Sequence, residues 1–136
     1  MKKYFSLTLK EIPKIAKDIA HQLHGGEILA LIGDLGSGKT AFTKALARHL
    51  KIKGRITSPT FMLMNIFPAR LPKTRKGILF LHLDLYRTKN FSEIKALGLT
   101  ELWGKKNTIT AIEWADKIKN HLPKKTWIIK FDDKKN

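Results

Sequence analysis

The sequence predicts a single α/β domain spanning residues 1–136, in which a mainly parallel central sheet is flanked by helices. Short continuous apolar runs, typical of strands buried on both faces, recur along the chain. Segments in which apolar residues recur at helical spacing alternate with these runs, as expected for strand–helix–strand units. The length of 136 residues suits one domain, for which about 100–200 residues is usual.

Residues 10–23 predict the first helix, because apolar side chains recur there at helical spacing: Ile12, Ile15, Ile19 and Leu23. Pro13 suits the first turn of this helix, and the glycine pair in HGG ends the pattern. The apolar run EILALIG then predicts a buried strand over residues 27–33.

The segment TAFTKALARHL, residues 40–50, predicts a second helix with two distinct sides. Its apolar side is expected to hold Ala41, Phe42, Ala45, Leu46 and Leu50. The opposite side is expected to hold Lys44, Arg48 and Lys51.

The second half of the chain predicts further strands and one short helix. ITSPTFMLMNIF (56–67) indicates a loop followed by a strand, and PARLPKTRKG (68–77) indicates a polar, basic turn. Apolar runs predict strands in ILFLHLDLY (78–86), TITAIEW (108–114) and TWIIKF (126–131). SEIKALGLTELW (92–103) predicts a short helix that Ser92 would cap.

The composition excludes several classes of protein. The chain has no cysteine, which excludes disulfides, thiolate nucleophiles and cysteine-based zinc sites. The N-terminus lacks the apolar run of a secretory signal, and no stretch approaches the roughly 18 apolar residues of a membrane span. We therefore expect a cytoplasmic protein with no membrane contact.

The charge is strongly positive, with 27 Lys and Arg against 11 Asp and Glu, for a net charge of +16. Residues 51–83 contain several basic residues and no acidic one. One interpretation is an electrostatic footprint for RNA or an acidic partner. The other is a lysine-rich composition whose solvated side chains keep a small protein soluble. The sequence leaves both open.

The segment GDLGSGKT, Gly33–Thr40, matches the phosphate-binding pattern G-x-x-x-x-G-K-[ST] and lies between a predicted strand and a predicted helix. Its glycines leave room for backbone N–H groups to converge on a polyphosphate, and the helix N-terminus adds further donors. Lys39 would reach the β- and γ-phosphates, and the Thr40 hydroxyl would bind Mg²⁺. The nucleotide-binding candidates are Gly33, Asp34, Leu35, Gly36, Ser37, Gly38, Lys39, Thr40 and Ala41.

This motif narrows the fold to a P-loop NTPase-like three-layer α/β domain, which needs a carboxylate near Mg²⁺. Asp84 and Glu113 each end a predicted parallel strand, so both would lie at the sheet edge that carries the phosphate loop. Either one could bind Mg²⁺ directly or through water while the other orients the attacking water. The alternatives are a turn cap for Asp84 and a solvated strand end for Glu113. Trp114 is expected to be a packing residue.

Two neighbouring segments have open roles. Tyr86 and Arg87 follow Asp84 and would contact phosphate or a partner, or else lie on the surface. The hydroxyl residues of TSPT, 57–60, flank a stiff proline, which suits a loop that senses the γ-phosphate. A simple turn is the alternative.

Four motifs in order, GDLGSGKT, ITSPTFMLMN, HLDLYR and IEWADK, resemble the TsaE (YjeE) family of ATPases over about residues 5–131. The resemblance implies a small bacterial P-loop ATPase that uses ATP and Mg²⁺ and supports threonylcarbamoylation of tRNA. It further implies docking on the TsaB–TsaD heterodimer, whose cycle ATP hydrolysis would reset, and weak activity without these partners. The positive charge would suit a tRNA nearby.

The resemblance also implies roles for individual residues. Residues 36–41 would hold the phosphates, Thr40 and Glu113 would bind Mg²⁺, and Asp84 would be essential for hydrolysis. Two other functions remain as alternatives. One is a small P-loop kinase acting on a metabolite, which requires an acceptor pocket and usually an arginine-bearing lid. The other is a nucleotide-gated RNA-binding module without catalytic activity.

Overall fold

The computed structural model describes residues 2–33, 38–54, 56, 64–88 and 90–131. Its centre is one six-stranded sheet with the strand order β1-β6-β2-β5-β4-β3. The strands are β1 (Lys3–Leu7), β2 (Ile28–Ile32), β3 (Met64–Arg70), β4 (Gly77–Asp84), β5 (Thr108–Glu113) and β6 (Trp127–Phe131). All neighbouring pairs run parallel except β3 and β4, which form an antiparallel pair at one edge. The predicted fold class, α/β with a mainly parallel sheet, is therefore confirmed.

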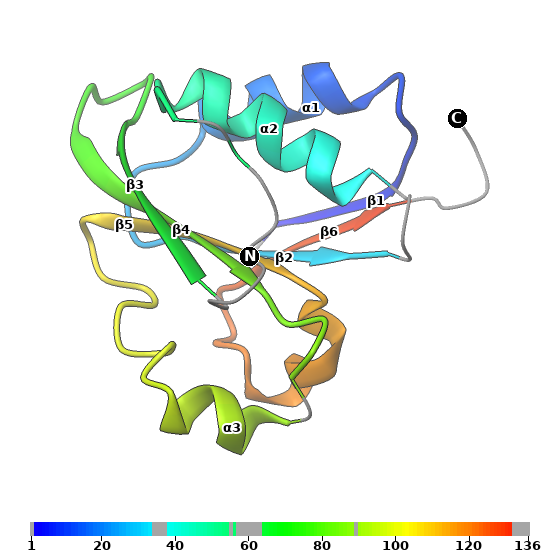
Figure 1. Ribbon diagram of the computed structural model, residues 1–136. Helices are drawn as coiled ribbons and strands as arrows, with labels where there is room; N and C mark the ends of the chain where they lie inside the picture. The colour runs from blue at the N-terminus through cyan, green and yellow to red at the C-terminus, as the bar shows by residue number, and fades with distance from the viewer. Residues whose placement is uncertain (1, 34–37, 55, 57–63, 89, 132–136) are drawn as a thin grey trace.

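Two helical layers cover the sheet (Figure 1). On one face lie α1 (Ile12–Ala20) and α2 (Lys39–His49), and on the other lie α3 (Phe91–Ala96) and the 3-10 helix η1 (Ala115–His121). Within the described ranges, no helix has both the length and the apolar character needed to cross a membrane.

The alternation of side chains along the strands separates the core into two apolar clusters. The cluster beneath α1 and α2 includes Ile19, Leu29, Phe42, Phe80 and Ile109. The cluster beneath α3 and η1 includes Ala30, Leu83, Ile94, Ile112 and Ile118. Phe80 of β4 and Ile109 of β5 face α2, and alternate residues of a strand face the same side. The later residues on that side are His82 and Asp84 in β4, and Ala111 and Glu113 in β5.

The second helix forms as its sequence predicts, with one exception. Phe42, Ala45, Leu46 and Leu50 are buried, and Lys44, Arg48 and Lys51 are exposed. Ala41, which was expected on the apolar side, is exposed instead. It lies in the first turn of α2, beside Thr40, which is also exposed.

Three local features differ from the sequence-based expectations. β1 was not predicted; it adds to the sheet edge through parallel pairing with β6, a partner far along the chain. Pro68 lies inside β3 rather than in a turn, which an edge strand tolerates because its outer side needs no N–H donor. Asn90, not Ser92, caps α3: its side chain accepts a hydrogen bond from the Glu93 N–H at 3.0 Å.

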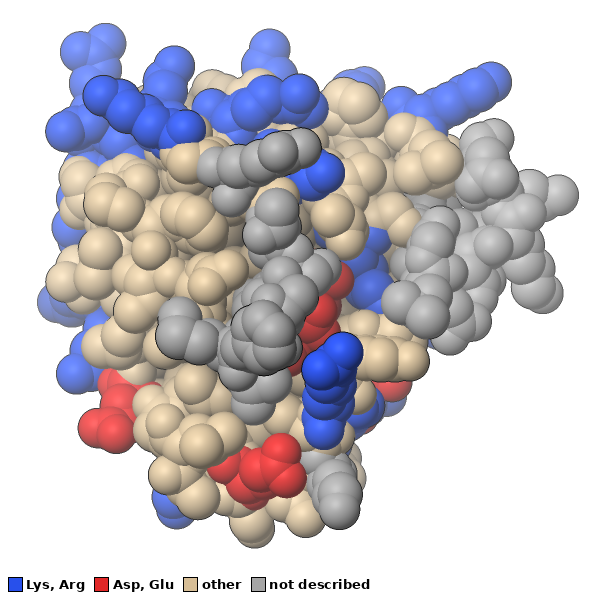
Figure 2. All heavy atoms as spheres, in the orientation of Figure 1, with Lys and Arg blue, Asp and Glu red and all other residues tan. Residues whose placement is uncertain are grey.

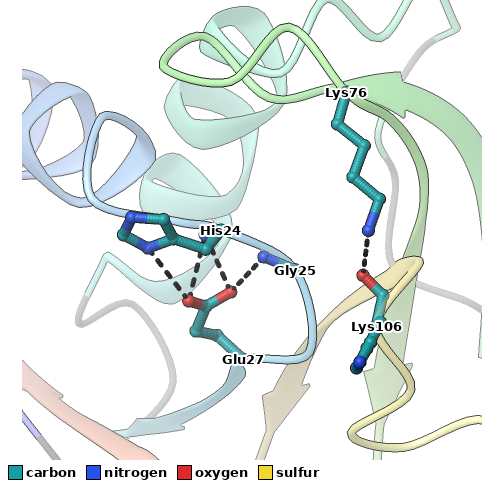
Figure 3. Close-up of polar contacts among 5 residues, drawn as sticks. All are labelled: His24, Gly25, Glu27, Lys76 and Lys106. Carbon is teal, nitrogen blue, oxygen red and sulfur yellow. Dashed lines mark hydrogen bonds and ion pairs between the residues drawn. The ribbon is translucent and has the colours of Figure 1, made fainter.

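The loop between α1 and β2 is held by polar contacts close to the start of β2 (Figure 3). The Glu27 carboxylate accepts hydrogen bonds from the backbone N–H groups of His24 at 3.0 Å and Gly25 at 2.8 Å. Gly25 has φ +117°, and a Cβ there would lie 2.2 Å from the carbonyl oxygen of Lys106. Lys76 donates to that same carbonyl at 3.1 Å. Only glycine fits this close backbone approach, which ties the start of β2 to the loop before β5.

Candidate active site

The candidate site lies where the carboxyl ends of β2, β4 and β5 meet the N-terminus of α2. Parallel register aligns Leu31 with Glu113, and Glu113 with Asp84. Gly33 follows β2 at the same edge, and Lys39 is the first residue of α2. Among the described candidates, the structure therefore brings Gly33, Lys39, Asp84 and Glu113 to one edge of the sheet.

Lys39 is buried, with 5% of its surface exposed. Its ammonium donates a hydrogen bond to the carbonyl oxygen of Gly33. The same Nζ atom lies 3.7 Å from the centre of the Trp114 ring, a cation–π contact. A positive charge is thus held at the strand ends by a carbonyl and an aromatic face.

Gly38 precedes the helix in a conformation that favours glycine, with φ +113°. A Cβ at this position would lie 2.6 Å from Cδ1 of Ile12 and 3.3 Å from Cδ2 of Leu9. The start of α1 therefore packs directly against the start of α2, and a larger residue than glycine would push them apart.

The first turn of α2 presents Thr40 and Ala41 to solvent. One turn later, the buried Thr43 hydroxyl donates to the Lys39 carbonyl at 2.9 Å, which fixes the start of the helix. The other phosphate-binding candidates, Asp34, Leu35, Gly36 and Ser37, lie outside the described residues, as does the TSPT segment.

Glu113 is the buried carboxylate of the site, with 3% of its surface exposed. Its Oε2 accepts a hydrogen bond from Nε2 of His82 at 2.7 Å, and His82 is fully buried. A carboxylate acceptor requires a proton on Nε2, so the tautomer follows from the contact. Among the described residues, Nδ1 of the same ring has no hydrogen-bond partner.

His82 is the member of the site that the sequence analysis did not single out. The signal was its place two residues before Asp84, since alternate strand residues face the same side of a sheet. That spacing puts His82 and Asp84 together, but the pairing with Glu113 depends on a neighbouring strand 31 positions away in the chain.

Asp84 differs from Glu113 because it is only half-buried. Its Oδ1 accepts a hydrogen bond from the Tyr86 N–H at 3.0 Å, so it does cap a turn. Burial raises the pKa of Asp84 above its ordinary value, and the nearby Glu113 charge raises it further. The Tyr86 N–H, His82 and Lys39 act in the opposite direction. The net result is a raised pKa. A cation bound nearby would favour the ionised form of Asp84 and so lower this pKa.

Behind these carboxylates, Trp114 links several parts of the site. It adopts a left-handed backbone conformation, φ 61°, which is uncommon for a bulky residue and costs energy. Its ring packs against Tyr86, with 5.2 Å between centroids. Lys117 donates to the carbonyls of Tyr86 and Thr88, the latter at 3.0 Å. Trp114 therefore packs, as expected, and also receives the ammonium of Lys39.

The donor set at this edge fits a divalent cation with a polyphosphate. Carboxylate and hydroxyl oxygens are the ligands that Mg²⁺ prefers, and one or two carboxylates plus phosphate oxygens suffice for it. Asp84 and Glu113 supply such oxygens, Thr40 lies in the exposed first turn of α2, and Lys39 supplies the positive charge.

The fold and this sheet edge together define an α/β protein of the P-loop NTPase-like class. Comparison with known families agrees with this class. The sequence model described as "Threonylcarbamoyl adenosine biosynthesis protein TsaE" matches residues 7–136. The chain belongs to the TsaE family.

Individual relatives give the same result. The chain is 41% identical to the tRNA threonylcarbamoyladenosine biosynthesis protein TsaE of Aquifex aeolicus (strain VF5), over 78% of this chain and 71% of that protein. It is 37% identical to the TsaE protein of Bacillus subtilis (strain 168), over 89% of this chain and 71% of that protein. It is 36% identical to the TsaE protein of Borreliella burgdorferi, over 85% of this chain and 79% of that protein.

Proposed function

We propose that this chain is a cytoplasmic Mg²⁺-dependent ATPase that serves tRNA threonylcarbamoyladenosine modification by acting on the TsaB–TsaD complex. The single observation that carries the ATPase proposal is the row of Asp84 and Glu113 beside the buried ammonium of Lys39. Membership of the TsaE family supports the pathway, because relatives at 36–41% identity are named for it.

Nucleotide binding is assigned to the start of α2. The backbone N–H groups in the first turn of a helix and the positive end of its dipole attract phosphate. Lys39 would exchange its contact with the Gly33 carbonyl for phosphate oxygens, which are stronger acceptors for an ammonium because they are charged. The cation–π contact with Trp114 keeps this side chain over the site in the meantime.

Magnesium is assigned to Thr40, Glu113 and Asp84. When bound, the ion would neutralise charge that develops on the phosphates during transfer. His82 fixes Glu113 through one carboxylate oxygen, a common arrangement for orienting a metal-binding carboxylate. Asp84, more exposed and already bonded to the Tyr86 N–H, is the better placed of the two to orient an attacking water.

The partner assignment is tested by capture of the chain on purified TsaB–TsaD, with and without ATP, followed by phosphate release from the recovered complex. We expect ATP-dependent capture and faster release of free phosphate than from the chain alone. No capture in either condition would refute the partner assignment. Transfer of phosphate to an acceptor other than water would instead support a kinase.

The metal assignment has a test that does not depend on turnover. Mn²⁺, which resembles Mg²⁺ in its oxygen ligands, is followed by electron paramagnetic resonance as it binds the protein with a non-hydrolysable ATP analogue. Glu113→Gln should weaken Mn²⁺ binding about tenfold or more, because even the loss of a residue that only orients a metal ligand typically costs about 10–100-fold. Glu101→Gln, an exposed carboxylate on the opposite layer, is the matched control. Equal affinities for both variants would refute the assignment of Glu113.

A further inference from the structure

A groove lies at the far end of α2, away from the candidate active site. It consists of two adjoining hollows of about 230 and 490 Å³ that share Ile52 and Gly54. One wall is the end of α2 and the segment after it, and the other is the edge strand β3. Phe67 and Pro68 of β3 line the larger hollow and give it a partly apolar surface.

Cations surround this groove, which we call the basic groove. Its charged lining residues are Lys44, Arg48, Lys51, Lys53 and Arg70. All five are exposed, and none of the described residues that line the two hollows is acidic. Within the described part of the chain, none of these five side chains forms an ion pair with a carboxylate, so their positive potential is not cancelled locally.

The walls of the basic groove are fixed in relation to each other. The Arg70 N–H donates to the carbonyl of Leu50 at 2.8 Å, which ties β3 to the end of α2. Lys51 has a left-handed backbone conformation, φ 59°, that turns the chain out of the helix. The Ile52 N–H closes this turn on the Ala47 carbonyl at 3.1 Å. Lys44, Arg48 and Arg70 therefore stand on regular elements and Lys51 in a closed turn, whereas Lys53 follows that turn.

The surrounding layer is also positive. Figure 2 shows lysine and arginine gathered along the upper edge, over the α1 and α2 layer, whereas the acidic residues visible in this view lie lower. The pKa of His49 on α2 is lowered, first by partial burial and then by nearby positive groups, including Arg48 and Lys51. The lowered pKa of His49 is thus consistent with a positive electrostatic potential around the end of α2.

We propose that the basic groove binds the sugar–phosphate backbone of RNA, with tRNA as the RNA concerned. Lysine and arginine on the two walls match phosphates on either side of a strand, and such contacts are independent of base sequence. The apolar surface at Phe67 and Pro68 suits the faces of exposed bases or riboses. The choice of RNA over an acidic protein rests on the proposed role in tRNA modification.

The test measures binding of the full chain to a fluorescent, unmodified tRNA transcript by anisotropy. Five phosphate contacts predict that affinity falls on the order of 10²-fold between 50 and 200 mM salt. The triple variant Lys51→Glu, Lys53→Glu, Arg70→Glu should lose most of the affinity at 50 mM salt and flatten the salt dependence. The matched control is Lys105→Glu, Lys119→Glu, Lys124→Glu, which makes the same charge change at exposed positions outside the groove.

Equal losses in the two triple variants would overturn the proposal, because binding would then follow net charge and not the groove. Competition with polyglutamate gives a second outcome. If polyglutamate displaced tRNA at equal charge concentration, the groove would be a general site for acidic polymers and the RNA assignment would fall. Calorimetry with ATP and Mg²⁺ on the same preparations separates this result from a failure of the proposed ATPase function.

Discussion

The two ends of α2 treat positive charge in opposite ways. At its start, Lys39 is buried and held by a carbonyl and an aromatic ring, with Asp84 and Glu113 close by. Its other end lies about 16 Å away, since the helix has 11 residues. There the exposed cations of the basic groove stand together, and no acidic residue is found among the described lining residues.

This difference shows how one helix serves two kinds of recognition. A buried charge with fixed partners acts at one position, and low local dielectric makes it strong there. Exposed charges act together over a longer range and are weakened by salt. The first arrangement suits the chemistry of a small ligand, and the second suits docking of a large polyanion. Mutations at one end of α2 should therefore impair ATP hydrolysis, and mutations at the other end should impair RNA binding, each without the other.

The largest expected effect is that of Lys39→Ala. Removing the ammonium should lower ATP hydrolysis by about 10²-fold or more, because it stabilises charge that develops on the phosphates. The affinity for tRNA should stay within about twofold of the wild-type value, since the charges of the basic groove are unchanged and salt screens the distant Lys39 position. Phosphate release and tRNA anisotropy measure the two properties on one preparation.

Lys95→Ala on α3 is the control for this variant, because Lys95 is exposed and lies on the opposite layer. It should hydrolyse ATP at the wild-type rate. If Lys39→Ala lost both activities together, the separation of the two ends of α2 would be wrong.

The next effect concerns the histidine–glutamate contact of the site. His82→Leu leaves the buried Glu113 carboxylate without its donor, which should lower the free energy of unfolding by about 1–3 kcal/mol. Adding Glu113→Leu should restore much of this loss, because no buried charge then remains unpaired. Urea denaturation of the two single variants and the double variant measures the coupling.

The chain offers a matched surface pair for comparison. His24 and Glu27 lie 3.8 Å apart, with 60% of the His24 side chain exposed. His24→Leu should change the free energy of unfolding by no more than about 0.5 kcal/mol, because contacts of a solvent-exposed side chain contribute little. Equal losses for His24→Leu and His82→Leu would show that burial does not set the strength of the inner contact.

The smallest expected effect is a gain in the stability of the folded protein, whereas the preceding variants are expected to lose activity or stability. The raised pKa of Asp84 means that its charge destabilises the folded protein without nucleotide, at any pH above that raised value. This destabilisation is relieved as the pH falls from the raised pKa towards the ordinary aspartate range, because the folded state then takes up the proton first. Asp84→Asn removes the charge but keeps an acceptor for the Tyr86 N–H.

Asp84→Asn should therefore raise the melting temperature near pH 7 by about 1–2 °C, a small change because water screens a half-exposed carboxyl. The gain should disappear at pH values below the ordinary aspartate pKa. Hydrolysis should fall in the same variant. A lower melting temperature at pH 7 would mean that the Asp84 charge stabilises the fold, contrary to the direction of its pKa shift.

Much of the fold follows from local patterns. The continuous apolar runs of β2, β4 and β5 and the helical spacing in α1 and α2 were sufficient to predict five of these elements and a mainly parallel sheet. The features that the sequence did not predict lack such a signal. β1 is an edge strand defined by its pairing with β6, and the cap of α3 shifted by two residues because Asn90 competes with Ser92 for the same role.

For this protein, the sequence by itself determined which residue types stand at the strand ends and at the start of α2, since strand period and the phosphate-binding pattern are local properties. Only the tertiary structure decided that Asp84 and Glu113 share one register row, that His82 holds Glu113, and that the end of α2 meets β3 in a basic groove. These pairings join segments distant in the chain. They depend on sheet register and on which buried polar group finds a partner, and those are decided by packing of the whole domain.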